Sequence, residues 1–162
     1  MALTLEGRVE LLTGMTFRGV SGSGHDTLMD SEPAAGGEER GARPMEVILL
    51  AFGGCTGMDV ISILRKMRQD VVGYEVRLVG ERTEQQPTVF TDVTVEHVVR
   101  GRELSVENVR RAVELSATRY CPVSAMLSRG GVHVTERYRV IDEATGEEQA
   151  GVLEKGASES PS

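Results

Sequence analysis

The two cysteines are the residues of this chain best suited to covalent chemistry, and Cys55 lies within the glycine-rich sequence GGCTG. A glycine inside a helix costs about 1 kcal/mol relative to alanine. Three of them so close together suggest that another backbone or a small ligand approaches the thiol. The alternative is an inert cysteine buried beside a helix contact. The three glycines are Gly53, Gly54 and Gly57.

The second thiol, Cys121, follows 66 residues later and directly precedes Pro122. Proline favours the first position of a helix. Cys121 is therefore expected at the N-cap, where backbone N–H groups and the helix dipole favour a thiolate. The alternative is a residue that only marks a kink. Two sheltered thiols fit a cycle in which one is oxidised to a sulfenic acid and the other resolves it as a disulfide.

Charged residues near Cys55 bear on this chemistry. Asp59 follows four residues later on the same helical face, and a nearby carboxylate opposes the formation of a thiolate. A cation would have to outweigh Asp59 if Cys55 attacks a substrate. Arg18 and Arg43 are the candidates.

Composition narrows the class of protein. The 162 residues are 40% hydrophobic and 27% charged, which predicts one soluble domain over residues 1–141. The net charge of −7 argues against nucleic-acid binding. Residues 142–162 form an acidic tail rich in glycine, serine and glutamate, predicted to be disordered. Two cysteines are too few for a secreted disulfide scaffold and no signal-peptide pattern is visible, so a cytoplasmic protein with free thiols is expected.

Hydrophobic periodicity predicts the order βββ-α-ββ-α-α-β, an α+β fold. Short strands are expected first, then a long helix, a hairpin, two helices and a last strand. The expected ranges are strands at 3–12, 15–20 and 24–30, a helix at 44–69, strands at 71–83 and 88–100, helices starting at Ser105 and Pro122, and a strand at 132–141.

The long helix is apolar on most sides, which raises the alternative of a membrane span. Asp59, Ser62 and the Gly53–Gly54 pair argue against a span, which needs about 20 apolar residues. The helix is therefore predicted to be buried on nearly all sides. Three short strands cannot cover it, so a homodimer that forms around this helix is expected.

Two stretches of the chain resemble the OsmC/Ohr family of thiol peroxidases. They are PMEVILLAFGGCTGMDVISILRKMR and YCPVSAML, and the similarity extends over about residues 5–141. The resemblance implies an OsmC-like intertwined homodimer with two sheets around long central helices and active sites at the subunit interface. By this resemblance, Cys55 matches the thiol that attacks the peroxide and Cys121 matches the resolving thiol.

The activity implied by the resemblance is the reduction of organic hydroperoxides, with the disulfide reduced again by an external dithiol, of the lipoyl type in parts of the family. No metal, flavin or other cofactor is expected, and no CxxC or HxxxH spacing indicates zinc. One alternative is an OsmC-like thiol protein that binds small electrophiles or lipids with weak or no peroxidase turnover. A third is a structural dimer whose cysteines only pack.

Other family positions match less closely. In the best-studied branch a glutamate directly follows the proline, whereas here Met45 intervenes and Glu46 comes next. Glu46 would lie ~13.5 Å along the helix axis from Cys55 and on the opposite side, so it either acts from the partner subunit or caps the helix. Arg18 is the candidate activating cation. His25 either faces the same cleft or stabilises a turn.

The remaining histidines are given no role in the chemistry. His97 and His133 both fall in predicted strands, where they are expected to be surface or packing residues.

Overall fold

The computed structural model describes residues 3–153, which form two compact units, one ending at Ile48 and the other beginning at Leu49. Strands and helices follow each other as sequence periodicity predicts, with one additional strand at the end. The α+β class is therefore confirmed.

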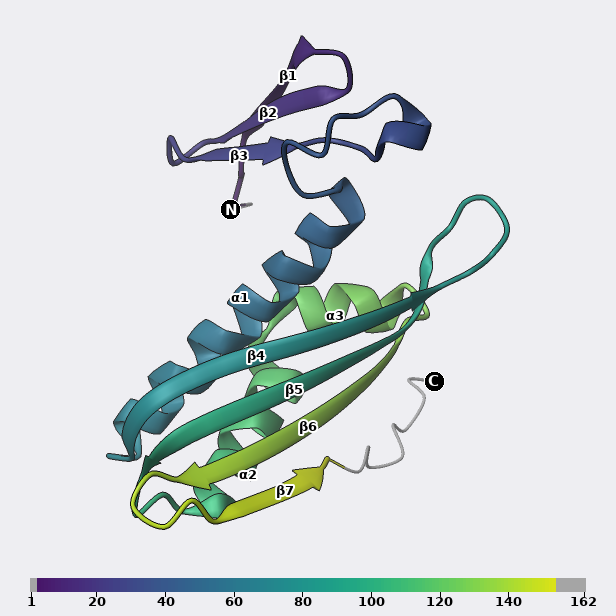
Figure 1. The fold of residues 1–162 in the computed structure, drawn as a ribbon. Coiled ribbons are helices and arrows are strands. Elements are labelled where there is room, and N and C mark those ends of the chain that lie inside the picture. The colour runs from purple at the N-terminus through teal and green to yellow at the C-terminus, as the bar shows by residue number, and fades with distance from the viewer. Residues whose placement is uncertain (1–2, 154–162) are drawn as a thin grey trace. The chain divides into compact units, whose positions relative to one another are not determined.

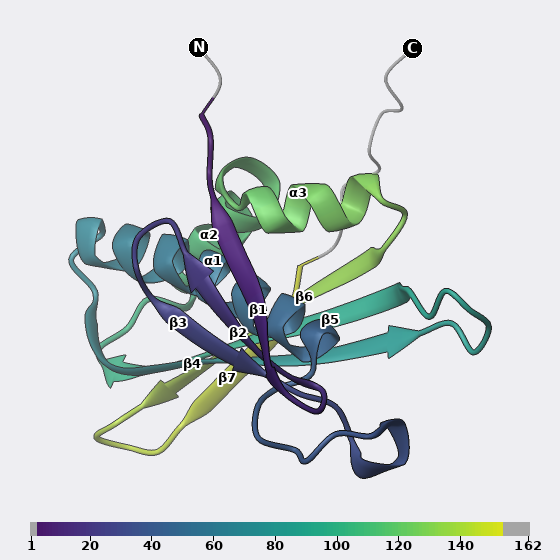
Figure 2. The ribbon, with the colours of Figure 1, turned by 90° about the horizontal axis from the view of Figure 1, so that it is seen from above.

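The N-terminal unit contains an antiparallel meander. Its strands are β1 (Gly7–Thr13), β2 (Thr16–Ser21) and β3 (Asp26–Met29), with β2 in the middle (Figure 2). Gly14 supplies the positive φ of 53° that the tight β1–β2 turn requires. A short 3₁₀ turn, η1 (Pro33–Ala35), follows β3. Within β1 even the apolar side chains are exposed, Val9 by 59% and Leu11 by 57%.

A four-stranded sheet forms the second unit. Its order is β4-β5-β6-β7, and β5 and β6 run parallel while the two outer pairs are antiparallel. The strands are β4 (Asp70–Arg82), β5 (Phe90–Arg102), β6 (His133–Asp142) and β7 (Glu148–Val152).

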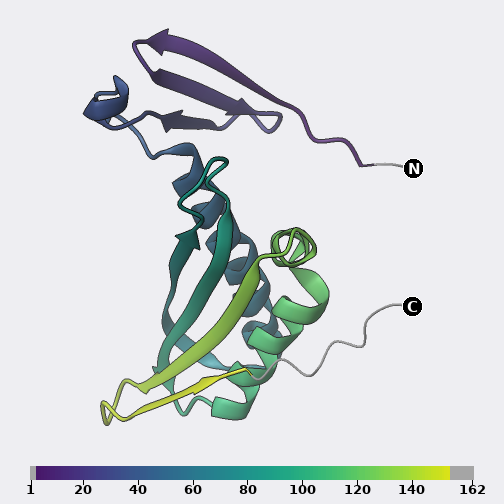
Figure 3. The same cartoon turned by 90° about the vertical axis from the view of Figure 1, so that its right-hand side faces the viewer.

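The parallel pair requires a crossover, and helices supply it. Helix α2 (Val106–Leu115), the π-helical turn η2 (Ser116–Tyr120) and helix α3 (Pro122–Arg129) connect β5 to β6. Ser105 caps α2 by accepting a hydrogen bond from the Asn108 N–H at 3.2 Å. The crossover helices lie on the same face of the sheet as the long helix α1 (Pro44–Lys66), as Figures 1 and 3 show.

Alternation along the strands separates the two faces of this sheet. The helix-covered face carries the fully buried Val93, Val95 and Val99 of β5. The opposite face carries ion pairs, in which Arg139 bonds Glu96 and Glu148. Between the sheet and the helices lies one apolar core. Its buried members are Val60, Leu64, Val99, Val109, Ala112, Val113 and Val140.

Glycines let α1 lie close to β4. A Cβ at Gly53 would stand 2.7 Å from Leu78 Cδ1, and one at Gly57 would stand 3.4 Å from Val76 Cγ2. Gly54 is different, because a Cβ there would meet nothing within 4 Å. Two of the three glycines around Cys55 therefore accommodate side chains of β4.

One sequence prediction about the fold was wrong. The region 142–162 was expected to be disordered, yet β7 at Glu148–Val152 pairs with β6; residues 154–162 lie outside the described part. The long helix was expected to be buried on nearly all sides with the help of a second copy of the chain, and within one chain Leu50 is 63% and Met58 74% exposed. An 18-residue window of α1 has a mean hydropathy of 2.0, so by length and composition alone this helix could cross a membrane, and 28% of that window is buried within the chain.

The glycine contacts generate a matched pair of substitutions. Gly54→Ala should raise the free energy of unfolding by about 1 kcal/mol, because alanine favours the helix and the new Cβ meets nothing. Gly53→Ala forces Leu78 to move, and overpacking of this kind costs about 1–3 kcal/mol. In urea denaturation, the free energy of unfolding of Gly54→Ala should therefore exceed that of Gly53→Ala by about 1–3 kcal/mol. Equal shifts for both variants would contradict the close contact between α1 and β4.

Candidate active site

The two thiols, distant in sequence, meet in the folded chain. Cys55 lies near the middle of α1 and is half-buried, whereas Cys121 lies between η2 and α3 and is 3% exposed. Both are free thiols. Their side chains are close enough that Cys55 acts on the ionisation of Cys121. The structure thus places a pair of sulfur atoms between the central helix and the crossover.

Cys121 caps α3, as its position before Pro122 predicts. Its backbone is extended, with φ −75° and ψ 106°, and its Sγ accepts a hydrogen bond from the Ser124 N–H at 3.4 Å. Burial nevertheless raises the pKa of Cys121 to about 12, and contact with Cys55 adds to this, while the Ser124 N–H only partly opposes it. The N-cap N–H groups thus favour the Cys121 thiolate, as expected from the sequence, but burial outweighs them.

A buried polar contact holds the crossover against α1 beside the thiols. Thr56 Oγ1 and Ser116 Oγ lie 2.8 Å apart, and both side chains are fully buried. The Ser116 hydroxyl donates to Asp59 Oδ2 at 3.0 Å, so Thr56 donates to Ser116. The backbone carbonyl of Ser116 accepts from the Cys121 N–H at 2.9 Å. Ser116 thus bonds both α1, which carries Cys55, and the backbone of Cys121.

The remaining sequence-predicted residues belong to the N-terminal unit, where each has local partners. Arg18 pairs with Asp26 at 2.7 Å and with Glu10 at 3.5 Å. His25 Nδ1 lies 3.0 Å from Ser23 Oγ, which gives His25 the turn-stabilising role. Neither residue is placed relative to the thiols, which lie in the other unit.

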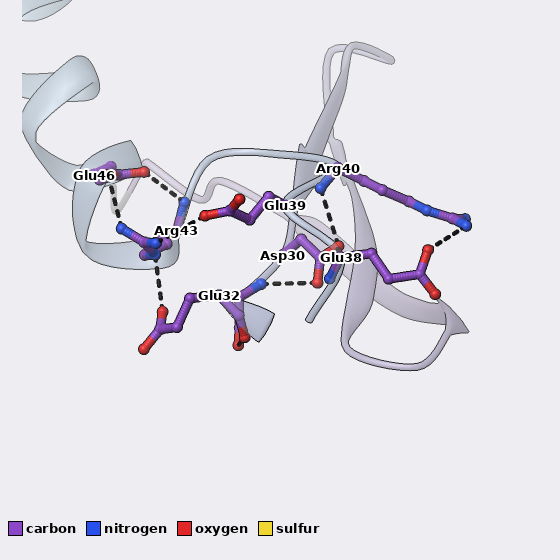
Figure 4. A network of polar contacts seen from close by, with 8 residues as sticks. Asp30, Glu32, Glu38, Glu39, Arg40, Arg43 and Glu46 are labelled. Carbon is purple, nitrogen blue, oxygen red and sulfur yellow. Dashed lines mark hydrogen bonds and ion pairs between the residues drawn. The ribbon is translucent and has the colours of Figure 1, made fainter. Parts of the chain in front are cut away.

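Glu46 caps α1 from within its own chain. Its Oε2 accepts a hydrogen bond from the Arg43 N–H at 2.8 Å, as in the reciprocal half of a capping box (Figure 4). The Arg43 guanidinium in turn lies 2.9 Å from Glu32, with Glu39 at 3.4 Å and Glu46 at 3.7 Å. Of the two roles that the sequence leaves open for Glu46, this contact supports helix capping. Arg43 is already surrounded by carboxylates.

Sequence reasoning missed a buried polar row centred on His97. This histidine is fully buried rather than a surface or simple packing residue. Its Nδ1 lies 2.6 Å from Tyr74 Oη, and its Nε2 lies 3.1 Å from Glu136 Oε2. Burial, together with the charges of Glu136 and Asp59, raises the pKa of Tyr74, so the phenol keeps its proton and donates it to Nδ1. The His97 Nε2–H then donates to Glu136.

One sequence signal could have found His97. It falls in phase with the buried valines at 95 and 99 of the same strand, so strict alternation places it on the helix-covered face. His133, the other histidine expected at the surface or in packing, is exposed. Within residues 3–153, no three His, Cys, Asp or Glu side chains are grouped so that they could hold a metal ion.

Comparison with known proteins agrees with this architecture. The model of the family described as OsmC-like protein matches residues 36–137. Protein YhfA of Escherichia coli K12 is 44% identical over 137 residues, which cover 85% of this chain and 98% of YhfA. A hypothetical protein from Aquifex aeolicus is 29% identical with a TM-score of 0.76, covering 88% of this chain and 99% of that protein.

A more distant structure, titled organic hydroperoxide resistance protein OsmC from Legionella pneumophila, shares the fold. It is 15% identical with a TM-score of 0.63 and covers 86% of this chain and 98% of its own. The family match covers more than half of the chain, and the similarity to YhfA extends over 85% of the chain. The chain belongs to the OsmC-like protein family.

Proposed function

We propose that this protein reduces organic hydroperoxides through Cys55, with Cys121 as the resolving thiol, in a reducing cytoplasm. The observation that carries the proposal is the proximity of two thiols separated by 66 residues in the sequence. Structural relatives titled organic hydroperoxide resistance proteins, from Legionella pneumophila and Bacillus subtilis, support the substrate class.

In the first step the Cys55 thiolate attacks the terminal oxygen of the hydroperoxide. A sulfur–oxygen bond forms, the O–O bond breaks, and the alkoxide leaves and takes a proton to become the alcohol. Cys55 is oxidised to a sulfenic acid. In the second step the Cys121 sulfur attacks the Cys55 sulfur, and the sulfenic hydroxyl leaves with the Cys121 proton as water. A disulfide joins the two residues.

An external dithiol completes the cycle. It reduces the Cys55–Cys121 disulfide by two exchange steps, becoming a cyclic disulfide while both protein thiols regain their protons. A lipoyl-type dithiol has the required chemistry. No metal or organic cofactor takes part in these steps.

The environments of the two thiols support these roles. A nucleophile must be ionised and reachable. Cys121 is neither at neutral pH, because burial raises its pKa to about 12 and only 3% of its surface is exposed. Half-buried Cys55 is the thiol that a substrate can reach. Cys121 meets only a sulfur that is already beside it, as a resolving residue should.

The proposed working form is a homodimer. The chain leaves large apolar side chains exposed on both units, including Leu11 and Leu28 in the meander and Leu50 and Met58 on α1. Exposed apolar surface on this scale is typical of association sites rather than of monomers. A second copy of the chain covers such surfaces symmetrically.

The peroxidase cycle is tested by counting free thiols after cumene hydroperoxide treatment. The wild-type protein should lose two thiols per chain and recover both with dihydrolipoamide. Cys55→Ser should lose none, while Cys121→Ser should consume one equivalent of peroxide and retain a sulfenic acid detectable by dimedone labelling. Loss of the first turnover in Cys121→Ser would reverse the two roles. Slow loss with adduct formation would instead favour the alternative, a protein that binds small electrophiles.

The buried state of Cys121 predicts an alkaline loss of stability. A free thiol has a pKa of about 8.5 in the unfolded chain, below its value in the folded chain. The folded state therefore holds the proton more tightly, and this contribution is complete below about pH 8.5 and declines as pH rises toward about 12.

Urea unfolding of the reduced protein between pH 7.5 and 10 measures this effect. The free energy of unfolding of the wild type should fall more steeply with pH than that of Cys121→Ser, by up to about 1.4 kcal/mol per pH unit. Other titrating groups cancel in the comparison. Parallel curves would show that Cys121 titrates normally and would remove the basis for its role.

Sedimentation equilibrium tests the dimer. The reduced protein should sediment with twice the 17.5 kDa mass of one chain. Met58→Glu places a charge on the exposed apolar side of α1 and should shift the equilibrium at least tenfold toward monomer or unfolded chain. Arg111→Ala, an exposed change on α2, should leave the mass unaltered. A wild-type protein that is monomeric at tens of micromolar would contradict the dimer.

A further inference from the structure

A cavity of about 950 Å³ lies where α2, η2 and α3 meet β6 and the end of the edge strand β7. Its volume is close to the upper end of the range for small-molecule sites, about 300–1,000 Å³. Val132, Val134, Val152 and Leu153 contribute apolar wall. The proposed peroxidase chemistry makes no use of this space.

The charged residues that line the cavity are unequally satisfied. Arg110 pairs with Glu107 at 2.7 Å and with Glu114 at 3.5 Å, and Arg111 also contacts Glu114 at 2.9 Å. Positive and negative charges therefore balance in this group. The Arg110 and Glu114 side chains are each 35% exposed, which places this ion pair at the solvent side.

Glu136 is the exception among the charged lining residues. Its side chain is only 7% exposed, and His97 Nε2 bonds one carboxylate oxygen, Oε2. The other oxygen, Oε1, is buried and accepts no hydrogen bond from any group in residues 3–153. A buried acceptor without a donor is destabilising, and more so when it is charged. The terminal torsion of a glutamate is soft, so a small rotation can bring Oε1 to a donor in the cavity.

The chemistry of the lining defines the ligand class. A buried acceptor with unused capacity requires a donor, and an unbalanced negative charge favours a cation. The valine and leucine walls favour an aliphatic body. We propose that this cavity binds a small organic cation, a protonated primary amine on an aliphatic chain, with Glu136 as its anionic anchor.

The cavity also adjoins the resolving thiol. Ser124 lines it, is 4% exposed, and donates its N–H to Cys121 Sγ. A ligand in the cavity would therefore contact Ser124, which is hydrogen-bonded directly to Cys121. Binding of the amine does not require peroxidase activity, so the amine site and the proposed function can be tested independently.

A matched probe series tests the site in the full-length reduced protein. Hexylammonium, hexanol and hexanoate share one aliphatic chain and differ in head-group charge. Isothermal titration calorimetry in phosphate buffer at pH 7 should show hexylammonium binding on the order of tenfold tighter than hexanol, since a charged hydrogen bond replaces a neutral one. Hexanoate should not bind. In ¹⁵N NMR, hexylammonium should shift the Ser124 amide.

Substitutions assign the anchor. Glu136→Gln keeps the shape and an oxygen for His97 but removes the charge, and should weaken hexylammonium binding at least tenfold while leaving hexanol binding unchanged. Glu114→Gln, at the already paired carboxylate of the same cavity, should change it less than threefold. Equal affinity of the wild type for hexylammonium and hexanol would overturn the proposal even if Glu136→Gln failed to fold. So would no binding of hexylammonium, or shifts confined to amides outside the cavity.

Discussion

The contact between α1 and the π-helical turn η2 is the constraint on which the thiol arrangement depends. Thr56 and Ser116 share a hydrogen bond of 2.8 Å in a fully buried setting, and Ser116 also donates to Asp59. Breaking such a contact leaves buried polar groups without hydrogen-bond partners, which lowers the free energy of unfolding by about 1–3 kcal/mol for each group. The π-helical turn adds a second bond, because the Cys121 N–H reaches five residues back to the Ser116 carbonyl. Ser116 thereby fixes the position of the segment that carries Cys121 relative to the helix that carries Cys55.

Burial, rather than helix capping, decides how the two thiols differ. At Cys121 the N–H of Ser124 favours the thiolate and desolvation opposes it. A charge at a helix terminus gains about 0.3–1 kcal/mol at exposed sites, whereas full burial can shift a pKa by about 3–5 units. Desolvation is therefore the larger effect, and the N-cap makes a well-placed but protonated thiol. Cys55, on α1, is close to Cys121 and is only half-buried.

Local patterns predicted most of the fold, and what they did not predict has one cause. Alternation and capping residues placed six strands and three helices correctly, because those signals lie within each element. Strand β7 carries a glutamate and a glycine and little apolar alternation; it is held by pairing with β6 and by the contact between Glu148 and Arg139. Similarly, the composition of α1 shows that it is apolar but not what covers Leu50 or Met58. Both depend on neighbours that are remote in sequence.

The candidate site divides in the same way. The cysteines could be singled out from residue type and from Pro122, but their contact depends on a crossover of three helical segments. Phase along β5 could have placed His97 inward, yet its partner Glu136 follows from the parallel register, which sets Val95 opposite Glu136. That register is produced by the crossover and not by either strand. The same crossover thus creates the thiol pair on the side of α1 and the buried carboxylate at the cavity beside β7, so both sites depend on how it packs.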